Sequence, residues 1–128
     1  MPKKKPKSND LGKSRHWRIF PFEPKAAPRP RVARGHAYMP AEYQEWKRLV
    51  RSYWGGSFIV GPVRVEIVVF KYRKNADLDN YAKAILDALS GVAFEDDNCT
   101  CVRDLNIWIC EDGQSEPDDG FSVEVMRW

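Results

Sequence analysis

The 128-residue chain has few cysteines, only two histidines and no long apolar run. Its three cysteines, Cys99, Cys101 and Cys110, form no C-x-x-C pair, which argues against a zinc site and a disulfide framework. No apolar segment approaches the roughly 20 residues that span a bilayer, and no hydrophobic segment follows the basic N-terminus, as a secretion signal would require. Because of these absences, we expect a cytoplasmic protein without membrane insertion.

The sequence also lacks the residue groupings of covalent catalysis. No Cys-His or Ser-His constellation stands out, and His16 and His36 have no partner at a metal-ligand spacing. The acidic stretch that begins at Asp77 is not an EF-hand, since Ala82 and Ala88 occupy the positions of the turn glycine and the bidentate glutamate. A covalent nucleophile and a caged calcium ion are therefore not expected.

The net charge of +3 hides a strong asymmetry along the chain. Residues 1–34 hold eleven Lys or Arg residues against Asp10 and Glu23, a net charge of +9 that leaves −6 for the remainder. A cationic segment beside an acidic centre suits a metal-dependent enzyme that acts on a polyanion. Residues 1–16 are expected to form a disordered basic arm, although such arms often only add solubility. Residues 17–128 are predicted to form one domain.

Six carboxylates and one cation occupy the stretch from Asp77 to Asp97, DLDNYAKAILDALSGVAFEDD. Its apolar residues recur at helical spacing, which predicts an amphipathic helix that ends near Gly91. Asp77 and Asp79 stand at the start of this helix, and an acidic triplet, residues 95–97, follows its end. Oxygen-only clusters suit Mg²⁺ or Mn²⁺, and the helix is expected to return the chain so that both acidic ends meet.

The same residues have a purely structural interpretation, which the pattern alone leaves open. Asp77 or Asp79 can cap the helix N-terminus and interact with its dipole. Lys83 can pair with Asp79 at a spacing of four residues, and Asp96 and Asp97 can be ordinary turn residues. One cap needs only one aspartate, however, so two aspartates and a later acidic triplet favour a metal site.

A proline- and arginine-rich segment, PKAAPRPRVARGHAYMP, occupies residues 24–40. It has too many prolines for a helix or a central strand and is predicted to be an extended loop. The prolines would hold its cations in a fixed row suited to phosphate contacts, although a solvated basic loop is the simpler alternative. The candidate DNA-binding residues of this segment are Lys25, Arg29, Arg31 and Arg34.

The remaining periodicity predicts an α+β fold, with a single domain and a mixed sheet that carries two helices. Strands are expected at residues 17–22, 63–73, 102–110 and 121–127. The first helix is expected to start at Pro40, to bury a stripe that includes Leu49 and Tyr53, and to end at Gly55. The resulting order of elements is β-α-β-α-β-β, without internal repeats.

Four segments of the chain follow a known pattern in the same order: KAAPRPRVARGHAYMP, GPVRVEIVV, DLDNYAKAILDAL and EDDN. They resemble the RusA family of Holliday-junction resolvases, which are bacterial and phage endonucleases. The resemblance covers about Ile19 to Ile109, and its most specific part is D-x-D-N-x-x-K followed by D-x-L and a D-D pair. It implies a homodimer that needs Mg²⁺ or Mn²⁺ and cuts opposing strands of a four-way DNA junction, in recombination and repair. The lysine-rich N-terminus and the acidic loop 111–119 depart from the family pattern.

The resemblance also implies roles for individual residues. Asp77, Asp79 and Asp97 match the essential acids and would hold one or two Mg²⁺ ions, with Asp96 beside the last of them. These ions would polarise the scissile phosphate and activate a water molecule. Lys83 matches the essential lysine and would stabilise charge that grows in the transition state. Neither a redox nor a nucleotide cofactor is expected. The further predicted DNA contacts are Arg73, Lys74 and Asn80.

Two other functions also fit these residues. In a noncatalytic nucleic-acid-binding protein, the acids would be helix caps and the arginine loop would bind DNA, but the triplet at residues 95–97 would repel the phosphates. A metal-dependent nuclease for flaps or single strands would have the same sequence features as a resolvase. The sequence therefore favours a metal-dependent endonuclease and leaves its preferred DNA structure open.

Overall fold

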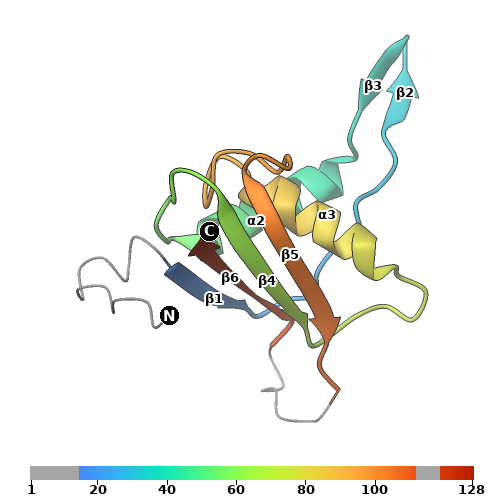
Figure 1. The fold of residues 1–128 in the computed structure, drawn as a ribbon. Helices are drawn as coiled ribbons and strands as arrows, with labels where there is room; N and C mark the ends of the chain where they lie inside the picture. Colours follow the sequence, from blue (N-terminus) through green and yellow to red (C-terminus); the bar gives the residue numbers. More distant parts are fainter. Residues whose placement is uncertain (1–14, 112–118) are drawn as a thin grey trace, which may run out of the picture.

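The computed structural model describes residues 15–111 and 119–128, apart from the side chain of Arg31. Four strands form a mixed sheet in the order β1-β6-β4-β5. They are β1 (Arg15–Phe20), β4 (Val63–Val69), β5 (Val102–Ile109) and β6 (Phe121–Arg127). The helices α2 (Ala41–Trp54) and α3 (Leu78–Leu89) lie on one face of this sheet (Figure 1). A separate two-stranded sheet pairs β2 (Arg31–Ala33) with β3 (His36–Tyr38).

The predicted α+β class is confirmed, together with two helices and a mixed sheet. The last strand has the predicted bounds, and Gly91, with a φ of 81°, directly follows the C-cap of α3. Only Arg15 and His16 of the predicted basic arm fall within the described residues, and both belong to β1. Most of the acidic loop 111–119 also lies outside them. Within the described parts of the chain, neither helix is long and apolar enough to cross a membrane.

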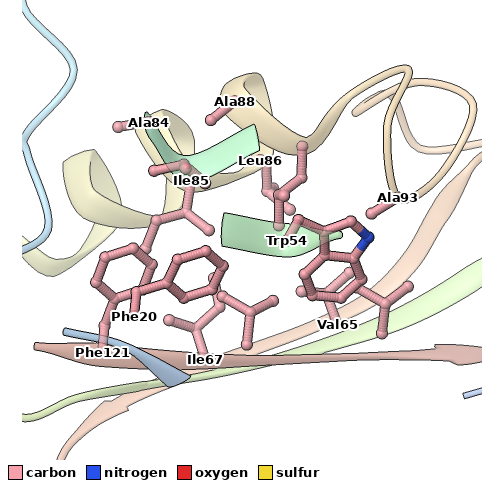
Figure 2. Close-up of a cluster of buried hydrophobic side chains, with 14 of the residues drawn as sticks. Phe20, Trp54, Val65, Ile67, Ala84, Ile85, Leu86, Ala88, Ala93 and Phe121 are labelled. Carbon is pink, nitrogen blue, oxygen red and sulfur yellow. The ribbon is translucent and has the colours of Figure 1, made fainter. Parts of the chain in front are cut away.

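The hydrophobic core fills the space between the helices and the sheet (Figure 2). Successive side chains of a strand point to opposite faces, so the alternation of β4 aims Val65 and Ile67 at the helices. Phe20 of β1 and Phe121 of β6 stack beside them, with ring centroids 4.5 Å apart. Burial of one such side chain contributes about 1.5–3 kcal/mol, and Trp54 of α2 is fully buried among them. These contacts fix both helices on the sheet.

The connection between β4 and β5 determines where the acidic residues lie. These two strands are parallel neighbours, with Val63 opposite Val102 at one end and Val69 opposite Ile109 at the other. The chain must therefore cross from the end of β4 back to the start of β5, and α3 lies in this crossover. Consequently, the start of α3 follows one end of the sheet, and the segment after α3 leads into the opposite end.

Several local predictions are wrong. The strands predicted at residues 17–22 and 63–73 run instead from Arg15 to Phe20 and from Val63 to Val69. Leu49 and Tyr53 are exposed, at 42% and 43%, because α2 meets the core through a narrower stripe. The buried residues of that stripe are Tyr43, Trp46, Val50 and Trp54. The predicted extended loop contains the β2–β3 hairpin, whose turn residues Arg34 and Gly35 have φ values of 53° and 78°. Positive φ at both positions is what a tight two-residue hairpin turn needs.

Candidate active site and nucleic-acid surface

The start of α3 carries two exposed carboxylates. Asp77 occupies the N-cap position, and its backbone oxygen accepts hydrogen bonds from the amides of Asn80 and Tyr81 at 3.1 and 3.2 Å. Its side chain, however, makes no capping hydrogen bond. Asp79 lies in the first turn and is also exposed. The structural alternative therefore does not account for the carboxylate of Asp77, which is left to face solvent.

Lys83 lies one turn after Asp79 on the outer surface of α3 and is exposed. None of the ion pairs among the described residues includes Lys83, so the pair with Asp79 that the spacing allows is absent there. An exposed ammonium without a fixed partner can turn toward a phosphate. The catalytic role of Lys83 stays a prediction.

Asp87, one further turn along α3, connects the two helices. Its Oδ2 accepts a hydrogen bond from the Tyr43 hydroxyl at 2.9 Å and pairs with Lys47 Nζ at 3.1 Å. The same ammonium lies 5.1 Å from the centroid of the Tyr43 ring. Burial, and to a lesser extent the hydrogen bond to Asp87, raises the pKa of Tyr43. No local sequence pattern predicts this group, although a buried tyrosine usually needs a partner for its hydroxyl.

The acidic triplet after α3 accepts hydrogen bonds from its own loop and from the segment before β4. The carboxylate of Asp96 accepts hydrogen bonds from the backbone amide of Asp97 at 2.8 Å and from Asn98 Nδ2 at 3.2 Å. Glu95 accepts one from the amide of Gly61, just before β4, at 2.7 Å. Burial, a hydrogen bond to Asp96 and the charges of Asp96 and Asp87 raise the pKa of Asp97. Negative charge is thus concentrated at this end of the helix.

The two acidic groups do not meet within one chain. Asp79 and Asp87 are eight residues apart on α3, about 12 Å along its axis, and Asp97 interacts with the Asp87 end. Among residues 15–111 and 119–128, no three His, Cys, Asp or Glu side chains are grouped so that they could hold a metal ion. The expectation that the helix brings both acidic ends together is therefore wrong for a single chain. The parallel crossover, which carries the chain from one end of the sheet to the other, is the physical reason.

The β2–β3 hairpin extends away from the rest of the fold (Figure 1). Arg29, Arg34 and His36 are exposed on or beside it, and the described part of residues 28–38 contains no acidic residue. Val32 and Tyr38 are also exposed, at 72% and 47%, although isolated two-stranded hairpins are only marginally stable in water. Cations and uncovered apolar side chains on a projecting hairpin fit a surface that binds a large anionic partner.

One family pattern matches most of this chain. The model described as Endodeoxyribonuclease RusA matches residues 21–125, which include the hairpin, both helices and the acids at each end of α3. The chain belongs to the RusA endodeoxyribonuclease family. It is therefore an endodeoxyribonuclease, of a family that acts on Holliday junctions, and the resemblance seen in its sequence is confirmed. A search of curated proteins found no match.

The structure of this RusA-family chain also places the remaining predicted DNA contacts. Lys25 and Arg73 are far apart in sequence but line the same pocket. Lys74 is exposed in the loop between β4 and α3, and the backbone oxygen of Asn80 accepts a hydrogen bond from the amide of Ala27 at 3.1 Å. This bond ties the segment before the hairpin to the first turn of α3. Lys25, Arg73 and Lys74 therefore lie near the end of α3 that carries Asp77 and Asp79.

Proposed function

We propose that this RusA-family nuclease is a Mg²⁺-dependent resolvase that cuts opposing strands of a four-way DNA junction, in recombination and repair. Mn²⁺ would substitute for Mg²⁺. The observation that carries the proposal is the family match over residues 21–125, because it spans the cationic hairpin and both acidic groups. The exposed carboxylates at the start of α3 support it, since a pure DNA-binding protein would gain nothing from repulsive charge beside its cations.

We further propose that the enzyme works as a homodimer. Asp79 and Asp97 lie at opposite ends of the crossover in one chain, so one copy does not assemble the predicted set of metal ligands. A two-fold axis places two identical surfaces against each other in opposite directions. Two α3 helices related in this way would put Asp77 and Asp79 of one copy near Asp97 of the other. A divalent cation held there would supply the polarisation of the scissile phosphate and a more acidic bound water.

The remaining residues would bind and orient the DNA. Arg29, Arg31 and Arg34 of the projecting hairpin would contact phosphates away from the cleavage site. Lys83, which is exposed one turn after Asp79, would stabilise negative charge on the reacting phosphate. Two sites related by a two-fold axis would match the symmetry of the junction and explain one nick in each of two opposing strands.

A substrate comparison tests the proposed activity. The purified protein would be incubated with a synthetic four-way junction, a linear duplex, a flap and a single strand, with Mg²⁺ and with a chelator. We expect paired nicks in the junction only when Mg²⁺ is present. Equal cleavage of the flap or the single strand would favour the other nuclease function, and binding without any cleavage would contradict the proposal.

Mixed dimers test whether each site is shared between two copies. In a heterodimer of Asp79→Asn and Asp97→Asn chains, a shared arrangement leaves one of the two sites with all of its acids. We expect each homodimer to be inactive and the mixture to recover single nicks. A mixture of Asp77→Asn and Asp79→Asn chains is the control, because each of its sites lacks one acid. No recovery in the first mixture, with heterodimers present, would contradict a shared site.

A further inference from the structure

A pocket of about 310 Å³ lies between the basic segment and the start of α3. Its walls come from residues 23–26, Trp46 of α2, Arg73 and Ala76 of the loop after β4, and Tyr81 of α3. This volume is near the lower end of the range for small-molecule pockets, about 300–1,000 Å³. The pocket is therefore suited to a single base or nucleotide rather than to a longer segment.

The pocket lies between the two groups of residues to which the proposed function assigns DNA. On one side, Ala26 is followed within three residues by Arg29, at the base of the hairpin. On the other side, Ala76 is followed directly by Asp77. The hydrogen bond from the Ala27 amide to the Asn80 carbonyl holds the two sides together. A DNA strand that ran from the hairpin to the carboxylates would therefore pass the mouth of the pocket.

The polar atoms of the two aromatic residues in the pocket wall make hydrogen bonds within the protein. The indole Nε1 of Trp46 donates to the Glu23 carbonyl at 3.2 Å, and the Tyr81 hydroxyl accepts a hydrogen bond from the Arg73 amide at 2.9 Å. Trp46 is 9% exposed and Tyr81 only 2%, so each contributes a small part of its surface to the floor of the pocket. Base rings can stack on the exposed part of an aromatic side chain.

The residues that line the pocket include two cations, Lys25 and Arg73, and one acidic residue, Glu23. The guanidinium of Arg73 enters none of the ion pairs of the described residues. Lys25 Nζ is 3.8 Å from Glu42, whose side chain is 87% exposed. Exposed ion pairs of this kind contribute little to stability, so a phosphate can replace the glutamate. Two cations beside a partly aromatic wall match the two chemical parts of a nucleotide.

We propose that this pocket binds one unpaired nucleotide of the DNA strand beside the cleavage site, with its phosphate on Lys25 and Arg73 and its base against the exposed part of Trp46. The proposal rests on the proposed function, since it names the part of the DNA that this surface holds. The pocket would therefore help to determine where the strand is cut. Contacts in the pocket would offset the free-energy cost of unstacking the extruded base.

A titration that involves no cleavage tests the pocket directly. The probe is deoxycytidine monophosphate, added to ¹⁵N-labelled protein, with inorganic phosphate as a second titrant. We expect saturable NMR shifts of the Trp46 indole N–H and of the amides of Ala26 and Ala76 with the nucleotide, and weaker shifts with phosphate. Ala76→Met, which fills the pocket, should weaken binding at least tenfold, whereas Ala41→Met, at an exposed position of α2, should not change it.

A second variant keeps the test valid if Ala76→Met does not fold. Arg73→Gln, at an exposed loop position, removes one rim charge and should weaken nucleotide binding severalfold. Absence of shifts in the wild type, or equal affinity in every variant, would overturn the pocket proposal. Because no DNA is cut, this result would leave the nuclease proposal intact. Conversely, nucleotide binding by a protein that cuts no junction would count against the proposed function alone.

The same variants can be tested on DNA. Junctions with 2-aminopurine at single positions near the cut report an unstacked base by increased fluorescence. We expect an increase at one position with wild-type protein and with Ala41→Met, in the absence of divalent cations. Ala76→Met and Arg73→Gln should reduce it. A junction that binds without an increase at any position near the cut would contradict an extruded nucleotide.

Discussion

Replacing Lys83 by alanine should leave the fold intact and slow DNA cleavage at least a hundredfold. Lys83 is exposed on α3 and enters none of the ion pairs of the described residues. Alanine has the highest helix propensity, so the free energy of unfolding should change by less than about 0.5 kcal/mol. A preorganised charge aimed at the reacting phosphate contributes a factor of about 10²–10³ in rate. The expected loss of cleavage rate is therefore much larger than the expected change in stability.

Lys47 provides a matched control, because it is also a helical lysine close to a carboxylate. Its side chain is only 13% exposed and pairs with Asp87 at 3.1 Å. Lys47→Ala removes a hydrogen bond to a charged group, which costs about 1.5–3 kcal/mol when the partner is buried and less here, where Asp87 is 40% exposed. For a domain of this size, each kcal/mol lowers Tm by roughly 3–5 °C. Lys47→Ala should therefore reduce thermal stability more than Lys83→Ala does.

Thermal unfolding and single-turnover cleavage of a four-way junction measure the two quantities separately. Single-turnover conditions remove product release from the comparison. We expect Lys83→Ala to melt within a few degrees of wild type, to bind the junction and to cut it at least a hundredfold more slowly. A Lys83→Ala rate within a few-fold of wild type would refute the catalytic assignment. A slow rate accompanied by a large loss of Tm would show that the effect comes from the fold.

Three further variants give distinct expected results. Asp79→Asn should abolish cleavage but leave junction binding equal or tighter, because it removes negative charge beside the phosphates; gel-shift and cleavage assays of the same preparation measure both. Arg29→Ala with Arg31→Ala should weaken binding to all DNA sequences and lower the log–log salt slope by about one for each lost phosphate contact, and an unchanged slope would place the hairpin away from DNA. Asp97→Asn should raise Tm near pH 7 without divalent cations, because the raised pKa of Asp97 means that its ionised form destabilises the fold. This gain should shrink as the pH falls toward about 4, where the unfolded carboxyl is itself protonated, and a gain that persists there would contradict the electrostatic explanation.

Much of the fold could be predicted because its periodicity is local. The apolar face of α3 recurs at helical spacing, and Gly91 marks its end through a backbone conformation that favours glycine. The alternation of Phe121, Val123 and Val125 defines β6 in the same way. The exposure of Leu49 and Tyr53 could not be predicted, because the width of the buried stripe depends on which segments pack beside α2.

The candidate site was less accessible to prediction. The residue types of the D-x-D-N-x-x-K segment indicate the chemistry, but they do not say that β4 and β5 are parallel. Only this pairing reveals that Asp79 and Asp97 lie at opposite ends of a crossover. The contact between Lys47 and Asp87 and the shared pocket of Lys25 and Arg73 likewise join residues that are distant in sequence. No local pattern contains that information.

The position of β6 has a consequence for how the chain folds as it is synthesised. The last strand lies inside the sheet, where it pairs with β1 on one side and β4 on the other. Arg15 is opposite Met126, so the first and last strands of the fold are direct neighbours. The four-stranded sheet cannot form completely until β6 has left the ribosome. Until then, β1 and β4 each have an edge without a neighbouring strand. Pairing between segments so distant in sequence is slow. During this time the nascent enzyme is prone to aggregation and is expected to be a substrate for chaperones.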